Sequence, residues 1–151
     1  MTSGTRTTEY KVREVEAPSS KEWDSLIQNT PDGGHVFQSH AWGEFKKRLG
    51  WTPVRLVMER DGETVGAGQF LLYNTVPVPG KLMYAPKGPW IDWEDEAAVR
   101  AFFRDVGSIA ADKGAHTVKI EPEVREEQEA TKALLRKIGF EKFRWDLNFK
   151  T

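Results

Sequence analysis

The 151-residue chain contains no cysteine. This absence excludes disulfide bonds, thiolate nucleophiles and cysteine-ligated zinc. The three histidines, His35, His40 and His116, lack the spacing of metal ligands, so we expect no metal site. No apolar run approaches the roughly 18 residues of a membrane span, and the polar residues 1–8 lack the apolar core of a secretory signal. We therefore expect a cytoplasmic protein whose residues 1–8 are disordered.

The chain also lacks an excess of charge of either sign, with 22 Lys and Arg residues against 23 Asp and Glu residues. No overall field therefore favours nucleic acid or a membrane, and an anionic ligand would need a local cationic cluster. Internal repeats and low-complexity segments are absent from the sequence. The length suits one domain, which we place at residues 9–151.

Two helices are predicted in the first third of the chain. Ser19 or Ser20 can cap the first, which the turn residues 30–34 end. The second runs from Ser39, its N-cap, to Leu49, and Gly50 follows as its C′ residue. Its apolar residues fall on one stripe, which we expect to be its buried face: Trp42, Phe45 and Leu49.

A hairpin follows the second helix. Residues 51–58 alternate in polarity, Asp61-Gly62 supplies a type I′ turn, and residues 63–73 form the returning strand. Gly66 and Gly68 in this strand indicate a bulge or the close approach of another backbone.

The remaining segments complete an α/β pattern. We expect a strand at 81–85, a rigid proline-containing loop at 86–89, a helix at 94–113, a strand at 116–120, a helix ending at Gly139 and a last strand at 140–149. With a first strand at 9–16, the order is β-α-α-β-β-β-α-β-α-β. This order predicts a mixed, mostly antiparallel sheet flanked by helices.

Two lysines are candidates for binding an anionic ligand. Lys46 lies four residues after Trp42, which predicts an ammonium group beside the buried stripe, at the rim of a cleft. The alternative is that Lys46 and its two basic neighbours only complement the helix C-terminus, at roughly 0.3–1 kcal/mol each. Lys87 extends from the rigid loop 86–89, which would present its charge from a fixed base.

Three further residues are candidates for the same cleft. The hydroxyl of Tyr84 can donate to a phosphate or a peptide carbonyl, although Tyr84 is equally a candidate half-buried strand residue. Gln38 and Trp42 either shape the cleft or serve as helix cap and core residue. Neither a Ser-His-Asp set nor a paired-carboxylate motif is present, so no catalytic residue is predicted.

Several segments resemble the opening domain of the Fem family, the aminoacyltransferases that build peptidoglycan bridges. They are VFQSHAWGEFK (36–46), LGW (49–51), DGE (61–63), GAG (66–68) and MYAPKGP (83–89). Together the resemblance covers about residues 20–125. It implies that residues 9–151 form a single acyltransferase domain of the GNAT type.

The resemblance also implies a function. Fem enzymes transfer an amino acid from aminoacyl-tRNA to the stem peptide of a nucleotide- or lipid-linked muropeptide, without a further cofactor. By resemblance, Lys46 would contact the phosphates of this precursor, and the other candidate substrate-binding residues are Lys87, Tyr84, Gln38 and Trp42. The acceptor amine would be deprotonated with help from the substrate itself, so positioning would supply much of the catalysis.

The resemblance accounts for one domain, whereas family members carry two in tandem. We therefore expect the chain to supply the acceptor-binding half. Its partners would be the precursor, aminoacyl-tRNA, and a second GNAT-like domain or another copy that docks on exposed aromatics such as Trp90 and Trp93. An alternative is a non-catalytic muropeptide-binding half or split subunit that needs a second domain.

A lower-ranked alternative is a coenzyme A-dependent N-acetyltransferase. Such enzymes bind a pyrophosphate at an Arg/Gln-x-x-Gly-x-Gly/Ala turn that opens a helix. The segment RDVGSI (104–109) departs from this pattern at its last position and lies inside a predicted helix.

Overall fold

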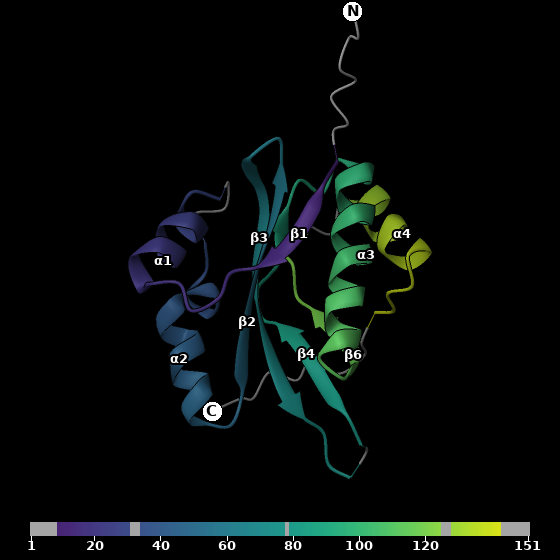
Figure 1. Ribbon diagram of the computed structural model, residues 1–151. Coiled ribbons are helices and arrows are strands. Elements are labelled where there is room, and N and C mark those ends of the chain that lie inside the picture. Colours follow the sequence, from purple (N-terminus) through teal and green to yellow (C-terminus); the bar gives the residue numbers. More distant parts are fainter. Residues whose placement is uncertain (1–8, 31–33, 78, 125–127, 143–151) are drawn as a thin grey trace, which may run out of the picture.

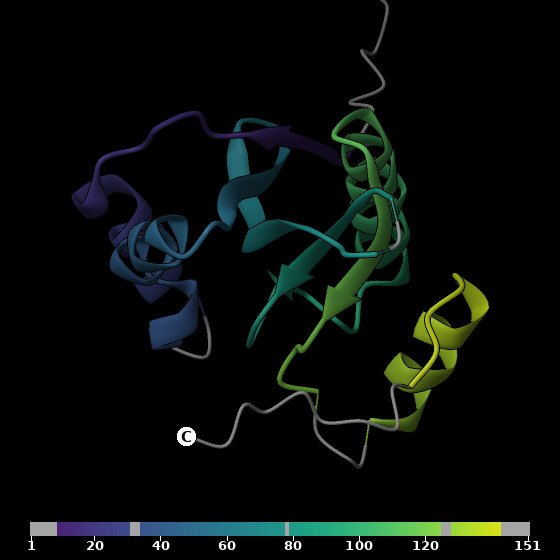
Figure 2. The same cartoon turned by 90° about the horizontal axis from the view of Figure 1, so that it is seen from below.

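A central sheet separates two helical layers in the computed structural model, which describes residues 9–30, 34–77, 79–124 and 128–142. One layer contains α1 (Ser20–Gln28), the short 3-10 helix η1 (Val36–Gln38) and α2 (His40–Arg48). The other contains α3 (Glu96–Asp112) and α4 (Glu129–Lys137). The two layers are visible from both directions in Figures 1 and 2, and they confirm the predicted α/β architecture.

The sheet is mixed and mostly antiparallel, as predicted. Its strands are β1 (Lys11–Glu14), β2 (Thr52–Arg60), β3 (Glu63–Asn74), β4 (Lys81–Ala85), β5 (Trp90–Ile91) and β6 (Ala115–Ile120). They follow the order β1-β2-β3-β4-β6, and β5 pairs with the beginning of β3. The β4–β6 pair is parallel and the other pairs are antiparallel.

The predicted caps and turns form in the structure. Ser19, the earlier of the two candidates, caps α1 in a reciprocal arrangement with Glu22, and Ser39 caps α2. Asp61 and Gly62 both have positive φ, at 51° and 80°, which confirms the type I′ turn between β2 and β3.

Gly66 and Gly68 mark the close approach of another backbone, as predicted. A Cβ atom at Gly66 would lie 2.6 Å from the Ile91 side chain, and one at Gly68 would lie 2.7 Å from Pro89. These two glycines therefore make room for the segment 89–91, which includes the unpredicted strand β5. A register shift between Met58 and Glu59 also lies opposite this part of β3.

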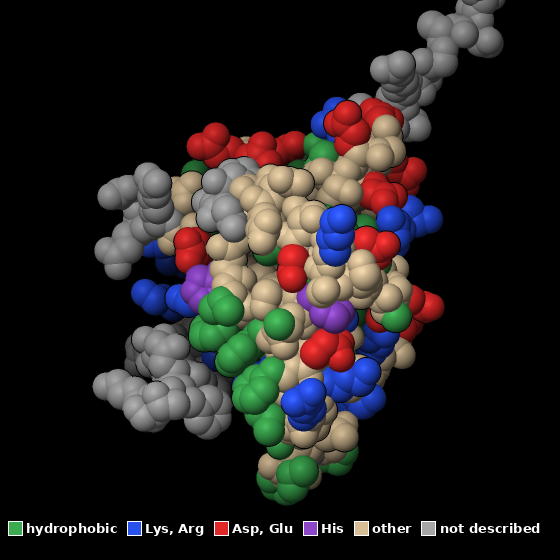
Figure 3. Space-filling view, turned by 90° about the vertical axis from the view of Figure 1, so that its left-hand side faces the viewer, with side chains coloured by type: hydrophobic (Ala, Val, Ile, Leu, Met, Phe, Trp, Pro, Cys, Tyr) green, Lys and Arg blue, Asp and Glu red, His purple; other side chains and the backbone are tan. Residues whose placement is uncertain are grey.

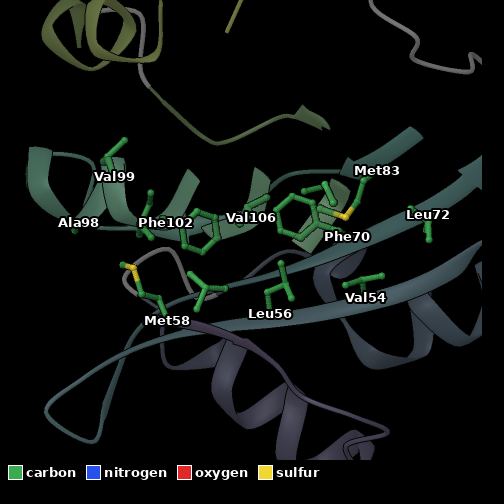
Figure 4. Packing of buried hydrophobic residues seen from close by; sticks show 14 of the residues in the cluster. Val54, Leu56, Met58, Phe70, Leu72, Met83, Ala98, Val99, Phe102 and Val106 are labelled. Atoms are coloured by element: carbon green, nitrogen blue, oxygen red, sulfur yellow. The ribbon is translucent and has the colours of Figure 1, made fainter. Parts of the chain in front are cut away.

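The main core lies between the sheet and α3 (Figure 4). Alternate residues of the strands point to it: Val54, Leu56 and Met58 from β2, Phe70 and Leu72 from β3, and Met83 from β4. The helix contributes Val99, Phe102 and Val106 to this core. A smaller cluster, formed by Trp23, Ile27, Val57 and Ala67, fixes α1 to the opposite face of the sheet.

The predicted buried face of α2 is wrong for two of its three residues. Phe45 is 48% exposed and Leu49 is 56% exposed, whereas Gly43 is buried. A Cβ atom at Gly43 would lie 2.6 Å from the Arg55 guanidinium and 2.5 Å from the Gln69 amide oxygen. The helix therefore lies with its small residue against polar side chains of the sheet, and Phe45 and Leu49 turn outward.

The end of the described chain differs from the prediction in part. Phe140 to Lys142 form no strand, and Phe140 instead packs edge-on against Phe103 at a ring-centroid distance of 4.8 Å. The rest of the predicted last strand, 143–149, and the predicted disordered residues 1–8 lie outside the described residues. Among the helices that are described, none is long and apolar enough to cross a bilayer.

Candidate functional site

Gln38 joins the α2 layer to the loop that follows β4. Its Nε2 atom donates to the carbonyl oxygens of Pro86 at 2.7 Å and Gln69 at 3.1 Å. Its Oε1 atom accepts from the Gln69 amide at 2.7 Å, and its own carbonyl accepts from the Trp23 indole at 2.8 Å. Since Gln38 is 4% exposed and both of its amide hydrogens are used, it positions the loop instead of offering a donor to a ligand.

The loop carries Lys87 on a constrained backbone. Lys87 has a φ of 54°, a conformation that non-glycine residues adopt rarely and that often marks functional sites. On one side of the loop, Gly88 lies so close to Gln38 that a Cβ atom would meet its amide at 2.7 Å. On the other side, the Glu121 amide donates to the carbonyl oxygens of Ala85 and Gly88, each at 3.1 Å. The exposed Lys87 side chain thus extends from the fixed base that the sequence predicted.

Lys46 lies over two indole rings at the C-terminal end of α2. Its Nζ atom is 5.1 Å from the Trp42 ring centroid and 5.6 Å from the Trp51 ring centroid, within cation–π range. Trp51 in turn stacks on Tyr73 at 4.5 Å, and Trp42 contacts Phe37 at 4.5 Å. Aromatic rings therefore restrict where the Lys46 ammonium can lie.

Neither candidate lysine forms an ion pair with a carboxylate of the described residues. Both side chains are consequently available to an anionic ligand, unlike Lys113, which pairs with Glu14 at 2.8 Å.

Tyr84 is half-buried, and its hydroxyl is already engaged. The hydroxyl donates to Glu121 Oε1 at 2.5 Å, and the Lys119 Nζ atom lies 4.9 Å from the ring centroid and 3.9 Å from Glu121. Burial, followed by this hydrogen bond, raises the pKa of Tyr84 well above its usual range. A ligand would meet the Tyr84 ring, or would have to displace Glu121 to reach the hydroxyl.

The two lysines lie on the same side of the sheet, at opposite ends of α2. Lys87 lines a small cavity of about 40 Å³ together with Ile27 of α1 and His35 beside η1, which places it on the α1 and α2 side. Within α2, the six residues from His40, which follows Gln38 by two positions, to Lys46 correspond to about 9 Å of helix axis. The lysines therefore border an extended surface instead of a single pocket.

A buried polar network under α2 was not predicted. Arg55 is 6% exposed, and its Nε atom donates to Gln69 Oε1 at 2.9 Å. Its Nη2 atom lies 3.4 Å from Glu44, while desolvation lowers the pKa of Arg55. The alternation of the strands would place Arg55 and Gln69 on the α2 side of the sheet. The signal in the sequence that a helix packs directly against them is the small residue Gly43.

The predicted exposed patch at Trp90 and Trp93 is wrong. Both residues are partly buried, and Trp93 packs against Phe103 at 6.1 Å. The large apolar side chains that are exposed in the described part of the chain lie elsewhere: Val36, Phe45, Leu49, Tyr73 and Val76.

Other site chemistries find little support in the described residues. They contain no group of three or more His, Asp or Glu side chains that could hold a metal ion. The segment 104–109 lies inside α3, so it does not form a pyrophosphate-binding turn. At the beginning of α3, Asp95 accepts from the Ala98 amide and places a negative charge where a pyrophosphate would need free amides.

The fold and the placement of these segments define an acyltransferase domain of the GNAT type. An aminoglycoside acetyltransferase from an uncultured soil metagenomic sample has the same fold, with a TM-score of 0.64 at 14% identity over 95% of this chain and 99% of that chain. The crystal structure of FemX gives a TM-score of 0.75 at 27% identity, over 87% of this chain and 32% of that chain.

The FemAB family model matches residues 19–138, and the chain belongs to this family, as the sequence predicted. The Lipid II:glycine glycyltransferase of Staphylococcus aureus (strain MRSA252) is 32% identical over 124 residues, which cover 81% of this chain and 29% of the relative. The protein of the same name from strain USA300 gives the same identity and coverage. The chain therefore spans less than a third of the length of these relatives.

Proposed function

We propose that this chain is the acceptor-binding part of a cytoplasmic aminoacyltransferase of peptidoglycan bridge synthesis. The reaction would transfer an amino acid from aminoacyl-tRNA to an amine in the stem peptide of a muropeptide precursor. Membership of the FemAB family supports this class of reaction, as do the relatives whose name specifies lipid II and glycine.

The observation that carries the proposal is the pair of unneutralised lysines on one side of the sheet. Lys46 lies over indole rings at one end of α2, and Lys87 extends from a fixed loop near the other end. A precursor with a diphosphate and a long peptide is extended and anionic. Two cations that are separated along a surface therefore match it better than a single compact pocket would. We assign the diphosphate to Lys46 and a more distant carbonyl or carboxylate to Lys87.

In this mechanism the chain orients the acceptor and supplies no base. The attacking amine would form the new amide bond at the ester carbonyl of the aminoacyl-tRNA as the ester C–O bond breaks, and the proton of the amine would pass to the departing tRNA oxygen, which leaves as a hydroxyl. Tyrosine, with an ordinary pKa of about 10, is protonated at neutral pH, and the raised pKa of Tyr84 favours the protonated form further, so it would not accept the proton of the amine. Correct placement of the two substrates would account for much of the rate enhancement.

Calorimetric titration of a nucleotide-linked muropeptide against the wild type, Lys46→Ala and Lys47→Ala tests the proposal. Lys47 is a matched control because it lies in the same helical turn and is exposed. Loss of one charge-assisted contact should weaken binding about tenfold or more in Lys46→Ala, while Lys47→Ala should bind like the wild type. Equal affinity for all three proteins would contradict the assignment of Lys46.

A second candidate function is muropeptide binding without transfer. Mass spectrometry of the precursor, after incubation with the protein and aminoacyl-tRNA, distinguishes transfer from binding without transfer. A mass increase of one amino acid residue supports transfer by this chain. Tight binding with unchanged mass supports a binding half that needs a second GNAT-like domain.

A further inference from the structure

We propose that one end of the molecule docks onto anionic lipid bilayers. This end, at the bottom of Figure 1, consists of the C-terminus of α2, the start of β2 and the β3–β4 connection. We call it the basal surface, and its members are the apolar Phe45, Leu49, Tyr73 and Val76 and the cationic Lys47, Arg48 and Lys81.

Exposed apolar side chains concentrate on the basal surface. Phe45 is 48% exposed, Leu49 56%, Tyr73 41% and Val76 89%. Val36, 62% exposed, lies at the other end of α2. Figure 3 shows hydrophobic side chains in a band that continues down to this end of the molecule. Single exposed apolar residues are ordinary, but a concentration of them at one end marks an interaction surface.

The same end is cationic although the whole chain has a net charge of −1. Segments 46–52 and 73–81 together contain four Lys or Arg residues and no Asp or Glu. Lys and Arg side chains lie beside the lower part of the apolar band in Figure 3. A bilayer with anionic headgroups matches this combination, because it accepts cations at the headgroups and apolar tips just below them.

The distribution of the residues favours a bilayer over a macromolecule with a fixed shape. The apolar side chains come from separate segments, and Val76, the most exposed of them, lies in the β3–β4 connection. Trp51 stacks on Tyr73, which belongs to this surface, and such amphipathic rings suit the interfacial region of a membrane. A second copy of the chain would bring like charges together, and RNA would leave the aliphatic Leu49 and Val76 without a role.

The basal surface does not depend on the proposed function, but the two would be compatible. Lys46 directly precedes Lys47 and Arg48, so docking would hold the Lys46 ammonium near the headgroups. The diphosphate of a lipid-linked acceptor also lies at that level. This last step alone rests on the proposed function.

Co-sedimentation with vesicles of phosphatidylcholine and phosphatidylglycerol, free of any peptidoglycan precursor, tests the surface directly. We expect binding that weakens as salt is raised and that is lost on pure phosphatidylcholine. Each cation near an anionic surface contributes about fivefold in affinity, so Lys47→Glu/Arg48→Glu should lose at least about twentyfold. Leu49→Ser/Val76→Ser should lose at least about tenfold, because two apolar tips no longer insert.

Matched controls lie elsewhere on the molecule. Arg136→Glu/Lys137→Glu makes the same charge change in the last turn of another nine-residue helix, α4, and Val36→Ser removes an exposed valine distant from the basal surface. Both should bind vesicles like the wild type, and circular dichroism should show every variant folded. Absence of vesicle binding, or an equal loss in Arg136→Glu/Lys137→Glu, would overturn the proposal. So would a dimer, or a tRNA complex, that depends on the basal surface while vesicles are ignored.

Discussion

The Nε2 atom of Gln38 donates a hydrogen bond to the carbonyl oxygen of Pro86 at 2.7 Å, although 48 residues separate the two along the chain. This contact joins the segment before α2 to the loop that carries Lys87. The position of one candidate ligand-binding lysine therefore depends on a buried side chain that itself contacts no ligand.

Replacing Gln38 with Ala should lower the free energy of unfolding by about 2–4 kcal/mol, because buried groups of Gln69 and Pro86 lose their partners. Urea denaturation followed by tryptophan fluorescence measures the change. Gln28→Ala is the control, since Gln28 is exposed at the end of α1, and it should change stability by less than about 0.5 kcal/mol. A loss of similar size in both variants would contradict the role assigned to Gln38.

Two helical glycines should respond to the same substitution with opposite sign. Gly43→Ala places a methyl group within 2.6 Å of Arg55 and Gln69, so we expect destabilisation of about 1–3 kcal/mol. Gly107→Ala, inside α3, meets nothing within 4 Å and should stabilise by about 0.5–1 kcal/mol through better helix propensity. Thermal unfolding of both variants tests the pair, and stabilisation by Gly43→Ala would show that α2 packs less closely than described.

The hydrogen bond from Tyr84 to Glu121 should make stability depend on alkaline pH. Because the pKa of Tyr84 is raised above its unfolded value of about 10, its contribution is fully present below pH 10 and is lost as pH rises through the folded pKa. The stability gap between the wild type and Tyr84→Phe should therefore be about 1 kcal/mol at neutral pH and should narrow above pH 10.

Tyrosinate absorbance provides an independent measurement of the same group. In the folded wild type, the Tyr84 phenol should ionise late or only on unfolding, and Tyr84→Phe should lack this late step. A stability gap that stays constant from neutral pH to pH 11 would contradict the expected linkage.

Lys87→Gly should separate ligand binding from folding. Glycine adopts a φ of 54° without the strain that lysine carries, so the unfolding free energy should stay within about 1 kcal/mol of the wild type. Affinity for the muropeptide should nevertheless fall, because the ammonium group is gone. Asp61→Gly, at another positive φ of 51° in the β2–β3 turn, is the matched control and should retain full affinity. Unchanged binding by Lys87→Gly would remove Lys87 from the proposed site.

Local signals in the sequence predicted most of the elements. Asp61-Gly62 predicts the β2–β3 turn because both positions need positive φ, and Ser39 and Gly50 bracket α2. The alternation in β2 predicts which side chains face α3. The two-residue strand β5 has no such signal, because its pairing depends on space provided by Gly66, 24 residues before Trp90.

The sequence proposes residues for the candidate site, and these remain predictions, but it does not predict their contacts. The rigidity of the loop around Lys87 follows from its prolines, whereas the use of Gln38 as a clamp depends on tertiary contacts with distant segments. The prediction of the buried face of α2 failed for a related reason. An apolar stripe normally marks the buried face of a helix, but here the sheet presents Arg55 and Gln69, and these polar groups accommodate Gly43.

Gly43, on the side of α2 that faces the sheet, affects which other residues of the helix are exposed. Turning the helix by one residue, about 100°, would place Trp42 or Glu44 where even a Cβ atom on Gly43 would lie within 2.6 Å of Arg55 and Gln69. The close packing at Gly43 therefore favours the observed rotation of the helix, and that rotation determines which side chains meet solvent. The exposure of Phe45 and Leu49 thus depends on the small size of the residue on the opposite side of the helix.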